Sequence, residues 1–165
     1  MEKKLAIKYV AEKLEKYGAR VYDYRGTEFI GIKNPNSENH MAFTFSDEEF
    51  GMEFTYQTAR FAYGNEDDCV LHAEKYLTDK LCAVEIFLNR KPLFGGSRQI
   101  PNAEFLSIKD FANYYAVDNE QIANNILGFM KNGGVSVKIL SWSGKFDQEF
   151  EIVVNGEELT INKIK

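Results

Sequence analysis

The feature that most constrains the fold is an alternation of apolar and polar residues along two neighbouring segments, 41–46 and 52–57. Their apolar positions are Met41, Phe43, Phe45, Met52, Phe54 and Tyr56. A period of two places alternate side chains on opposite faces of a β-strand. The pattern therefore predicts two strands, each with one buried and one exposed face, joined by the connection 47–51. Residues 59–64 are expected to extend the second strand past a bulge.

Further strands are expected before and after this pair. Segments 19–25 and 28–33 flank a glycine turn, and segment 81–89 is apolar on both faces, which is typical of a central strand. Asn155-Gly156 is a strong signal for a β-hairpin, because both residues accept the backbone of a tight turn. The strands expected in that part of the chain are 134–142, 148–154 and 157–164.

Three segments have the 3.6-residue spacing of amphipathic helices. The first, 3–17, ends before Gly18, a residue type that commonly follows the last turn of a helix. Its apolar stripe is Ile7, Val10, Leu14 and Tyr17. The second, 65–80, begins with Asn65 as a capping residue and with acids that suit the positive end of the helix dipole. Its inward residues are Cys69, Val70, Ala73, Tyr76 and Leu77. The third, 107–131, is expected to form a hairpin of two helices.

These elements predict a single α+β domain over residues 1–165, with a mostly antiparallel sheet and amphipathic helices packed on one side. A chain of 165 residues is of ordinary size for one domain. No apolar run approaches the roughly 18 residues of a membrane span. The first residues are charged throughout and lack the apolar core of a signal peptide. The sequence therefore predicts a cytoplasmic protein with no membrane partner.

Residues 107–126 have the outline of a helix-turn-helix, which raises the question of DNA binding. Small and apolar residues stand near the positions that this motif requires, but any two short packed helices have the same spacing. Phosphate contacts need clustered cations. Between residues 105 and 131 the bases are Lys109 and Lys131, acids outnumber them, and the whole chain carries a net charge of -5. We therefore expect a structural hairpin and no nucleic-acid partner, and keep a DNA-binding regulator as the least favoured alternative.

Two cysteines and two histidines are the candidates for metal or thiol chemistry. Cys69 and His72 are one helical turn apart, and Cys82 and His40 would complete four ligands. However, Cys69 lies on the inward stripe while His72 lies about 100° away on the flank. Zinc sites usually have a more tightly paired spacing, and nothing marks a residue that would orient a catalytic histidine. The sequence therefore predicts free thiols, no metal, no cofactor and no catalytic residue.

The segment 91–105 is expected to be a long loop, and structureless loops of that length are often functional. Within it, Gly95, Gly96, Ser97 and Arg98 would form a backbone nest for an anion or another ligand. A glycine turn after a central strand accounts for the same residues and is the favoured interpretation. The ligand loop stays open as an alternative.

Acidic residues concentrate between positions 46 and 68, where seven acids stand against the single base Arg60. Helix capping and solubility explain part of this charge, and steering toward a basic partner would explain the rest. The residues predicted to bind a partner are Asp47, Glu48, Glu49, Glu53, Tyr56, Gln57, Arg60 and Tyr63. In this prediction the alternation places Glu53 and Gln57 on one face, opposite the aromatic residues.

The order of features in residues 41–96 resembles small bacterial toxin-immunity proteins. An aromatic strand, an acidic turn and a second aromatic strand run into an aromatic segment, and an amphipathic helix, a buried strand and a glycine turn follow. The resemblance covers about a third of the chain. It implies stoichiometric binding to a toxin domain. The aromatic segment 56–61 holds no histidine, so the resemblance implies no metal-dependent role.

The sequence therefore favours a non-catalytic, acidic, cytoplasmic protein-binding domain, an immunity-type inhibitor that occludes a basic toxin domain. The alternative from another class is a small enzyme or ligand-binding domain that uses the 91–105 loop.

Overall fold

The computed structural model describes residues 2–55, 57–88, 91–99, 135–155 and 158–164. The chain divides into two compact units, Met1–Leu81 and Cys82–Lys165, and each is described by itself. Helices and mostly antiparallel strands occur together, which confirms the α+β class. The expectation of a single domain stays a prediction.

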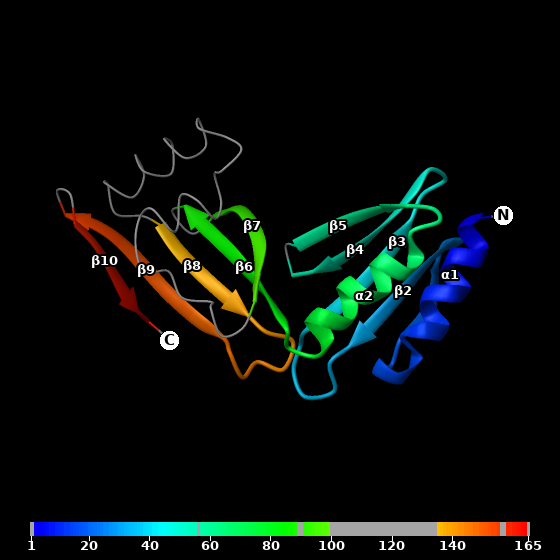
Figure 1. Ribbon diagram of the computed structural model, residues 1–165, viewed down its shortest axis with the longest axis horizontal. Coiled ribbons are helices and arrows are strands. Elements are labelled where there is room, and N and C mark those ends of the chain that lie inside the picture. Colours follow the sequence, from blue (N-terminus) through cyan, green and yellow to red (C-terminus); the bar gives the residue numbers. More distant parts are fainter. Residues whose placement is uncertain (1, 56, 89–90, 100–134, 156–157, 165) are drawn as a thin grey trace. The chain divides into compact units, whose positions relative to one another are not determined.

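The first unit is a five-stranded sheet with two helices. Its elements are α1 (Glu2–Lys13), a short 3-10 helix (Glu15–Tyr17), β1 (Arg20–Tyr24), β2 (Thr27–Lys33), β3 (His40–Phe45), β4 (Glu49–Phe54), β5 (Gln57–Ala62) and α2 (Glu66–Leu77). Every strand pairs antiparallel with the next one in the sequence, in the order β1-β2-β3-β4-β5. Figure 1 shows α1 and α2 together on one side of this sheet, as the sequence predicted.

The core of the first unit lies between the helices and one face of the sheet, which we call the covered face. Apolar residues opposite one another in the register fill it, and they are Ile30, Ile32, Met41, Phe43, Phe45, Phe50, Met52 and Phe54. The helices contribute their predicted stripes. Ile7, Val10 and Leu14 are buried and Tyr17 is half-buried, while all five inward residues of α2 are buried. The residues between these positions lie on the opposite face, which we call the open face.

Turns in the first unit depend on residues with positive φ. Gly18 follows the 3-10 helix at φ 88°, and Arg25 and Gly26, at 52° and 83°, join β1 to β2. Thr55, at φ 58°, lies where the chain reverses after β4. The expectation that 59–64 extend the second strand past a bulge was wrong, because β5 turns back and pairs antiparallel with β4. The predicted connection 47–51 is also shorter, since β4 already begins at Glu49.

The second unit is a sheet in which most neighbouring strands pair antiparallel. Its strands are β6 (Leu81–Leu88), β7 (Lys91–Gln99), β8 (Val135–Leu140), β9 (Gln148–Asn155) and β10 (Glu158–Lys163), in the order β10-β9-β8-β6-β7. Strand β6 has a neighbour on each side, and four consecutive residues from Cys82 to Glu85 are buried, which confirms the predicted central strand. The C-terminal hairpin is confirmed, because Asn155 of β9 pairs with Glu158 of β10.

The expected loop 91–105 was wrong in its first part, since residues 91–99 form β7. The expected helical hairpin, 107–131, lies outside the described residues. In the part of the chain that the structure describes, no helix has the length and hydrophobicity to cross a membrane.

Candidate functional site

Tyr63 links two neighbouring connections of the first unit. It follows β5, and its hydroxyl donates a hydrogen bond to the main-chain carbonyl of Ser46 at 2.5 Å, in the turn between β3 and β4. Its ring packs against Phe50, with ring centres 5.4 Å apart. The start of α2 and the β3–β4 turn are therefore held together at one end of the unit.

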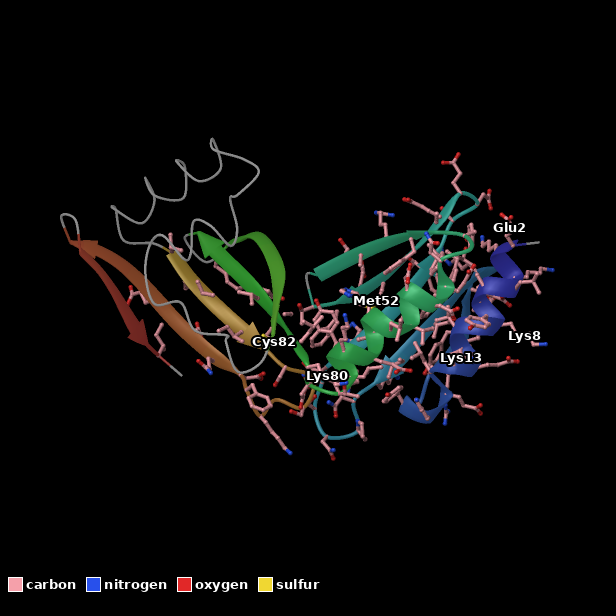
Figure 2. The ribbon with its side chains drawn as sticks, in the orientation of Figure 1. Glu2, Lys8, Lys13, Met52, Lys80 and Cys82 are labelled. Atoms are coloured by element: carbon pink, nitrogen blue, oxygen red, sulfur yellow. The ribbon has the colours of Figure 1, made fainter. Side chains whose placement is uncertain are left out.

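Acidic side chains from three elements gather around Tyr63. Burial raises the pKa of Tyr63, and the charges of Asp47, Glu2 and Glu66 raise it further. Glu2 begins α1, Asp47 lies in the β3–β4 turn and Glu66 begins α2, so the three come together only in the folded chain. Figure 2 shows Glu2 at one end of α1, with Lys8 and Lys13 farther along the helix. We call Glu2, Asp47, Glu48, Glu66 and Asp67 the acidic rim.

The β3–β4 turn presents its two acids to solvent. The hydroxyl oxygen of Ser46 accepts hydrogen bonds from the amides of Glu48 and Glu49, at 3.3 and 3.1 Å, so the turn is fixed by main-chain bonds. The carboxylates are not used in this network. The side chain of Asp47 is 98% exposed and lies 3.8 Å from the ammonium of Lys3. Such an exposed pair is weak and screened by salt, which leaves the rim negatively charged.

A cleft of about 480 Å³ adjoins the rim, between α1 and the start of α2. Leu5, Ala6 and Tyr9 supply its apolar side, while Glu12, Glu66 and Asp67 contribute carboxylates and Lys8 contributes an ammonium. The hydroxyl of Tyr9 donates a hydrogen bond to the carboxylate of Asp67, and this bond is the main reason that the pKa of Tyr9 is raised. Leu5 is 61% exposed, so an exposed apolar side chain lies in a cleft whose charged residues are three acids and Lys8.

The residues predicted to bind a partner divide between two places. Asp47 lies near Tyr63, and Glu48 follows Asp47 in the same exposed turn. Glu49, Glu53 and Arg60 instead occupy positions of the open face, where a guanidinium nitrogen of Arg60 lies 3.0 Å from a carboxylate oxygen of Glu49. Two of the expected binding residues, Glu49 and Arg60, are thus paired with each other in a salt bridge.

The expected arrangement of Gln57 was wrong. Gln57 is opposite Phe54 in the register, so its position is on the covered face and not on the face of Glu53. The cause is the reversal at Thr55, which the alternation could not reveal. Tyr56 lies outside the described residues.

Gly95, Gly96, Ser97 and Arg98 belong to β7 and not to a loop. The favoured interpretation, a glycine turn, was therefore wrong. In an extended strand, successive N–H groups point to opposite sides, so these residues do not form the alternative backbone nest either. Anion binding at these residues stays a prediction.

The cysteine and histidine geometry follows the helical spacing. Cys69 is fully buried, and burial raises the pKa of its thiol to about 12. His72 lies on the flank, with its ring edge-on to the Tyr76 ring and the two ring centres 5.3 Å apart. Burial lowers the pKa of His72. Cys69 and Cys82 are both buried thiols. Among the described residues, no three of the types His, Cys, Asp and Glu are grouped so that they would hold a metal ion.

Sequence reasoning missed the contribution of the first helix. Glu2 and Tyr9 belong to α1, and their place in the site follows from the packing of α1 beside α2. In the sequence, Asp67 fits the acidic start of α2, and nothing there marks it as a partner for Tyr9. A leucine and a tyrosine one turn apart, Leu5 and Tyr9, were the available signal, because both lie outside the buried stripe, Leu5 exposed and Tyr9 half-buried.

Comparisons with protein-family models, with curated proteins and with solved structures find no match for this chain. The resemblance of residues 41–96 to immunity proteins therefore stays a prediction.

Proposed function

We propose that the protein is a non-catalytic binding module of the immunity type, whose acidic rim docks on a basic surface of another protein, such as a toxin domain. The observation that carries the proposal is the convergence of acids from α1, the β3–β4 turn and α2 around Tyr63. Helix capping alone would explain Glu66 and Asp67, but it does not explain Asp47 and Glu48, which a turn sets outward beside them.

The rim and the adjoining cleft suit two different stages of binding. Exposed charge of one sign attracts a partner over distances of about a Debye length, roughly 8–10 Å, and so raises the association rate. Apolar groups such as Leu5 and Tyr9 contribute once water has been excluded, and therefore slow dissociation. A basic partner with one apolar or long aliphatic side chain would fit both.

The test is a charge reversal at the rim. Asp47→Lys with Glu48→Lys changes the net charge without touching the Ser46 hydrogen bonds, which use main-chain amides. The matched control is Glu28→Lys with Glu38→Lys, because both are exposed, lie elsewhere on the unit and give the same change in net charge. The first partner to assay is the purified product of the neighbouring reading frame.

The rim variant is expected to associate about tenfold or more slowly at low salt and to lose most of its salt dependence. The control should associate at nearly the original rate. Equal slowing in both variants would show that only net charge matters and would remove the rim as the site. Absence of binding by the neighbouring product would argue against the immunity-type role.

A further inference from the structure

The open face of the first sheet holds a small hollow. The hollow differs from the acidic rim in the chemistry of its residues. Its floor is made by Gly31 and Ala42, which are opposite each other on β2 and β3. The short side chain of Ala42 leaves a depression there, while the edge of the Tyr22 ring stands over Gly31. The hollow measures about 240 Å³ and is lined by Tyr22, Phe29, Gly31, Lys33, His40 and Ala42, together with backbone.

Aromatic rings form one wall of the hollow. Tyr22 and Phe29 are opposite each other in the register, and their rings stack with centres 5.4 Å apart. The Tyr22 ring also extends over Gly31, because a methyl group added there would lie 2.9 Å from Cε2 of Tyr22. The glycine therefore makes room for the ring. Both aromatic residues are only half-buried, so part of the stack stays open to solvent.

Charge is distributed unevenly around the hollow. The open-face positions of β1, β2 and β3 are Arg20, Tyr22, Tyr24, Thr27, Phe29, Gly31, Lys33, His40, Ala42 and Thr44. These positions carry no carboxylate, although the chain as a whole has a net charge of -5. The ammonium of Lys33 lies 6.0 Å from the centre of the Tyr22 ring, and Arg20 is opposite Gly31. On the other side, Glu53 is opposite Ala42.

One register line across the sheet therefore runs from a cation, past the foot of the Tyr22 ring, to an acid, and these two charged residues flank the hollow without lining it. The line passes through Arg20, Gly31, Ala42 and Glu53, which occupy four adjacent strands. Three strand spacings of 4.7–4.9 Å give a length of about 14 Å. A ligand that lies beside the Tyr22 ring and reaches both ends of this line has a flat ring in the middle, a negative group at one end, and a hydrogen-bond donor at the other.

We infer that the hollow binds a free nucleoside monophosphate whose base carries an exocyclic amino group. The base would stack against Tyr22, since aromatic side chains hold bases by their faces. The phosphate would lie near Lys33 and Arg20, and the amino group would donate to the Glu53 carboxylate. The hollow is smaller than a typical drug-sized pocket of about 300–1,000 Å³, which suits one ring system with its phosphate outside. This inference goes beyond the proposed function and uses a different surface.

The experiment measures binding of AMP, CMP, UMP, adenosine and inorganic phosphate to the full chain by titration calorimetry. AMP is expected to bind more tightly than adenosine, phosphate or UMP, because only AMP and CMP have ring, phosphate and amino group together. No binding by AMP or CMP at millimolar concentration would overturn the inference. Tighter binding of a short single-stranded oligonucleotide than of either monomer would overturn the assignment to a free nucleotide.

Substitutions in and beside the hollow test whether AMP binds there. Tyr22→Leu keeps an apolar side chain but removes the stack, and should weaken AMP binding roughly fivefold or more. Tyr24→Leu is the matched control, because Tyr24 is 65% exposed on the same strand and face but does not line the hollow. Lys33→Gln should weaken AMP while leaving adenosine unchanged, which separates loss of phosphate contact from misfolding. Equal weakening by Tyr22→Leu and Tyr24→Leu would overturn the assignment of the site.

Discussion

The two faces of the first sheet are built from the same five strands and differ in almost every other respect. On the covered face, Phe43, Phe50 and Phe54 are at most 1% exposed and form the core under the helices. The residues next to them in sequence lie on or beside the open face and are small or charged. Alternation therefore assigns stability to one face and leaves the other free to change for binding. The covered face should tolerate little substitution, and the open face should tolerate much.

Among these variants, a substitution at Phe43 on the covered face is expected to cause the largest loss of stability. Its side chain is fully buried between Ile30 and Met52, its cross-strand neighbours. Phe43→Ala removes most of the ring and leaves a cavity, so the free energy of unfolding should fall by about 3–5 kcal/mol. Urea unfolding followed by circular dichroism measures the change.

Thr44 provides the comparison at the next residue. It lies on the open face and is exposed, so Thr44→Ala should change the free energy of unfolding by no more than about 0.5 kcal/mol. Similar losses for the two variants would break the distinction between the faces.

A smaller effect concerns the helix that covers the sheet. Because burial raises the pKa of Cys69 from 9.0 to about 12, the folded state holds this thiol proton more tightly than the unfolded state does. The stabilisation is complete below the ordinary pKa and is lost as pH rises from 9.0 toward 12. The slope from this group is at most about 1.4 kcal/mol per pH unit. Urea unfolding across this pH range should show a shallower decline for Cys69→Ala, and identical slopes would mean that the thiol is not buried as described.

A modest loss of stability is expected at the edge of the covered face, where Tyr63 joins the core to the acidic rim. Tyr63→Phe keeps the ring against Phe50 and removes the hydrogen bond to the Ser46 carbonyl. The free energy of unfolding should fall by about 0.5–1.5 kcal/mol. A larger loss, comparable with that of Phe43→Ala, would place Tyr63 in the core and not at its edge.

Local periodicity predicted much of this fold, because burial along a strand or helix repeats with the period of the element. The alternation around Phe43 and the stripe through Cys69 both matched the observed burial. The Asn155-Gly156 signal matched the C-terminal hairpin for a similar reason, since turn geometry selects residue types locally.

The errors arose where tertiary structure overrides local signals. Glycines in 91–99 indicated a loop, but pairing within a sheet holds this segment extended as β7. Thr55 is a β-branched residue with positive φ, a combination that sequence patterns do not favour, and it marks a reversal where the alternation indicated a bulge. The site was predicted less well than the fold, because the contribution of Glu2 depends on how α1 packs and not on any motif.

The strand order has a consequence for how the chain assembles. In the first sheet every strand pairs with its neighbour in sequence, so each pairing closes a short loop and costs little chain entropy. In the second sheet, β6 pairs with β8, and Leu88 meets Val135 far along the chain. That contact must close a much longer loop before it contributes any stabilisation. The first sheet therefore has the topology associated with faster folding, and the second has the topology associated with slower folding.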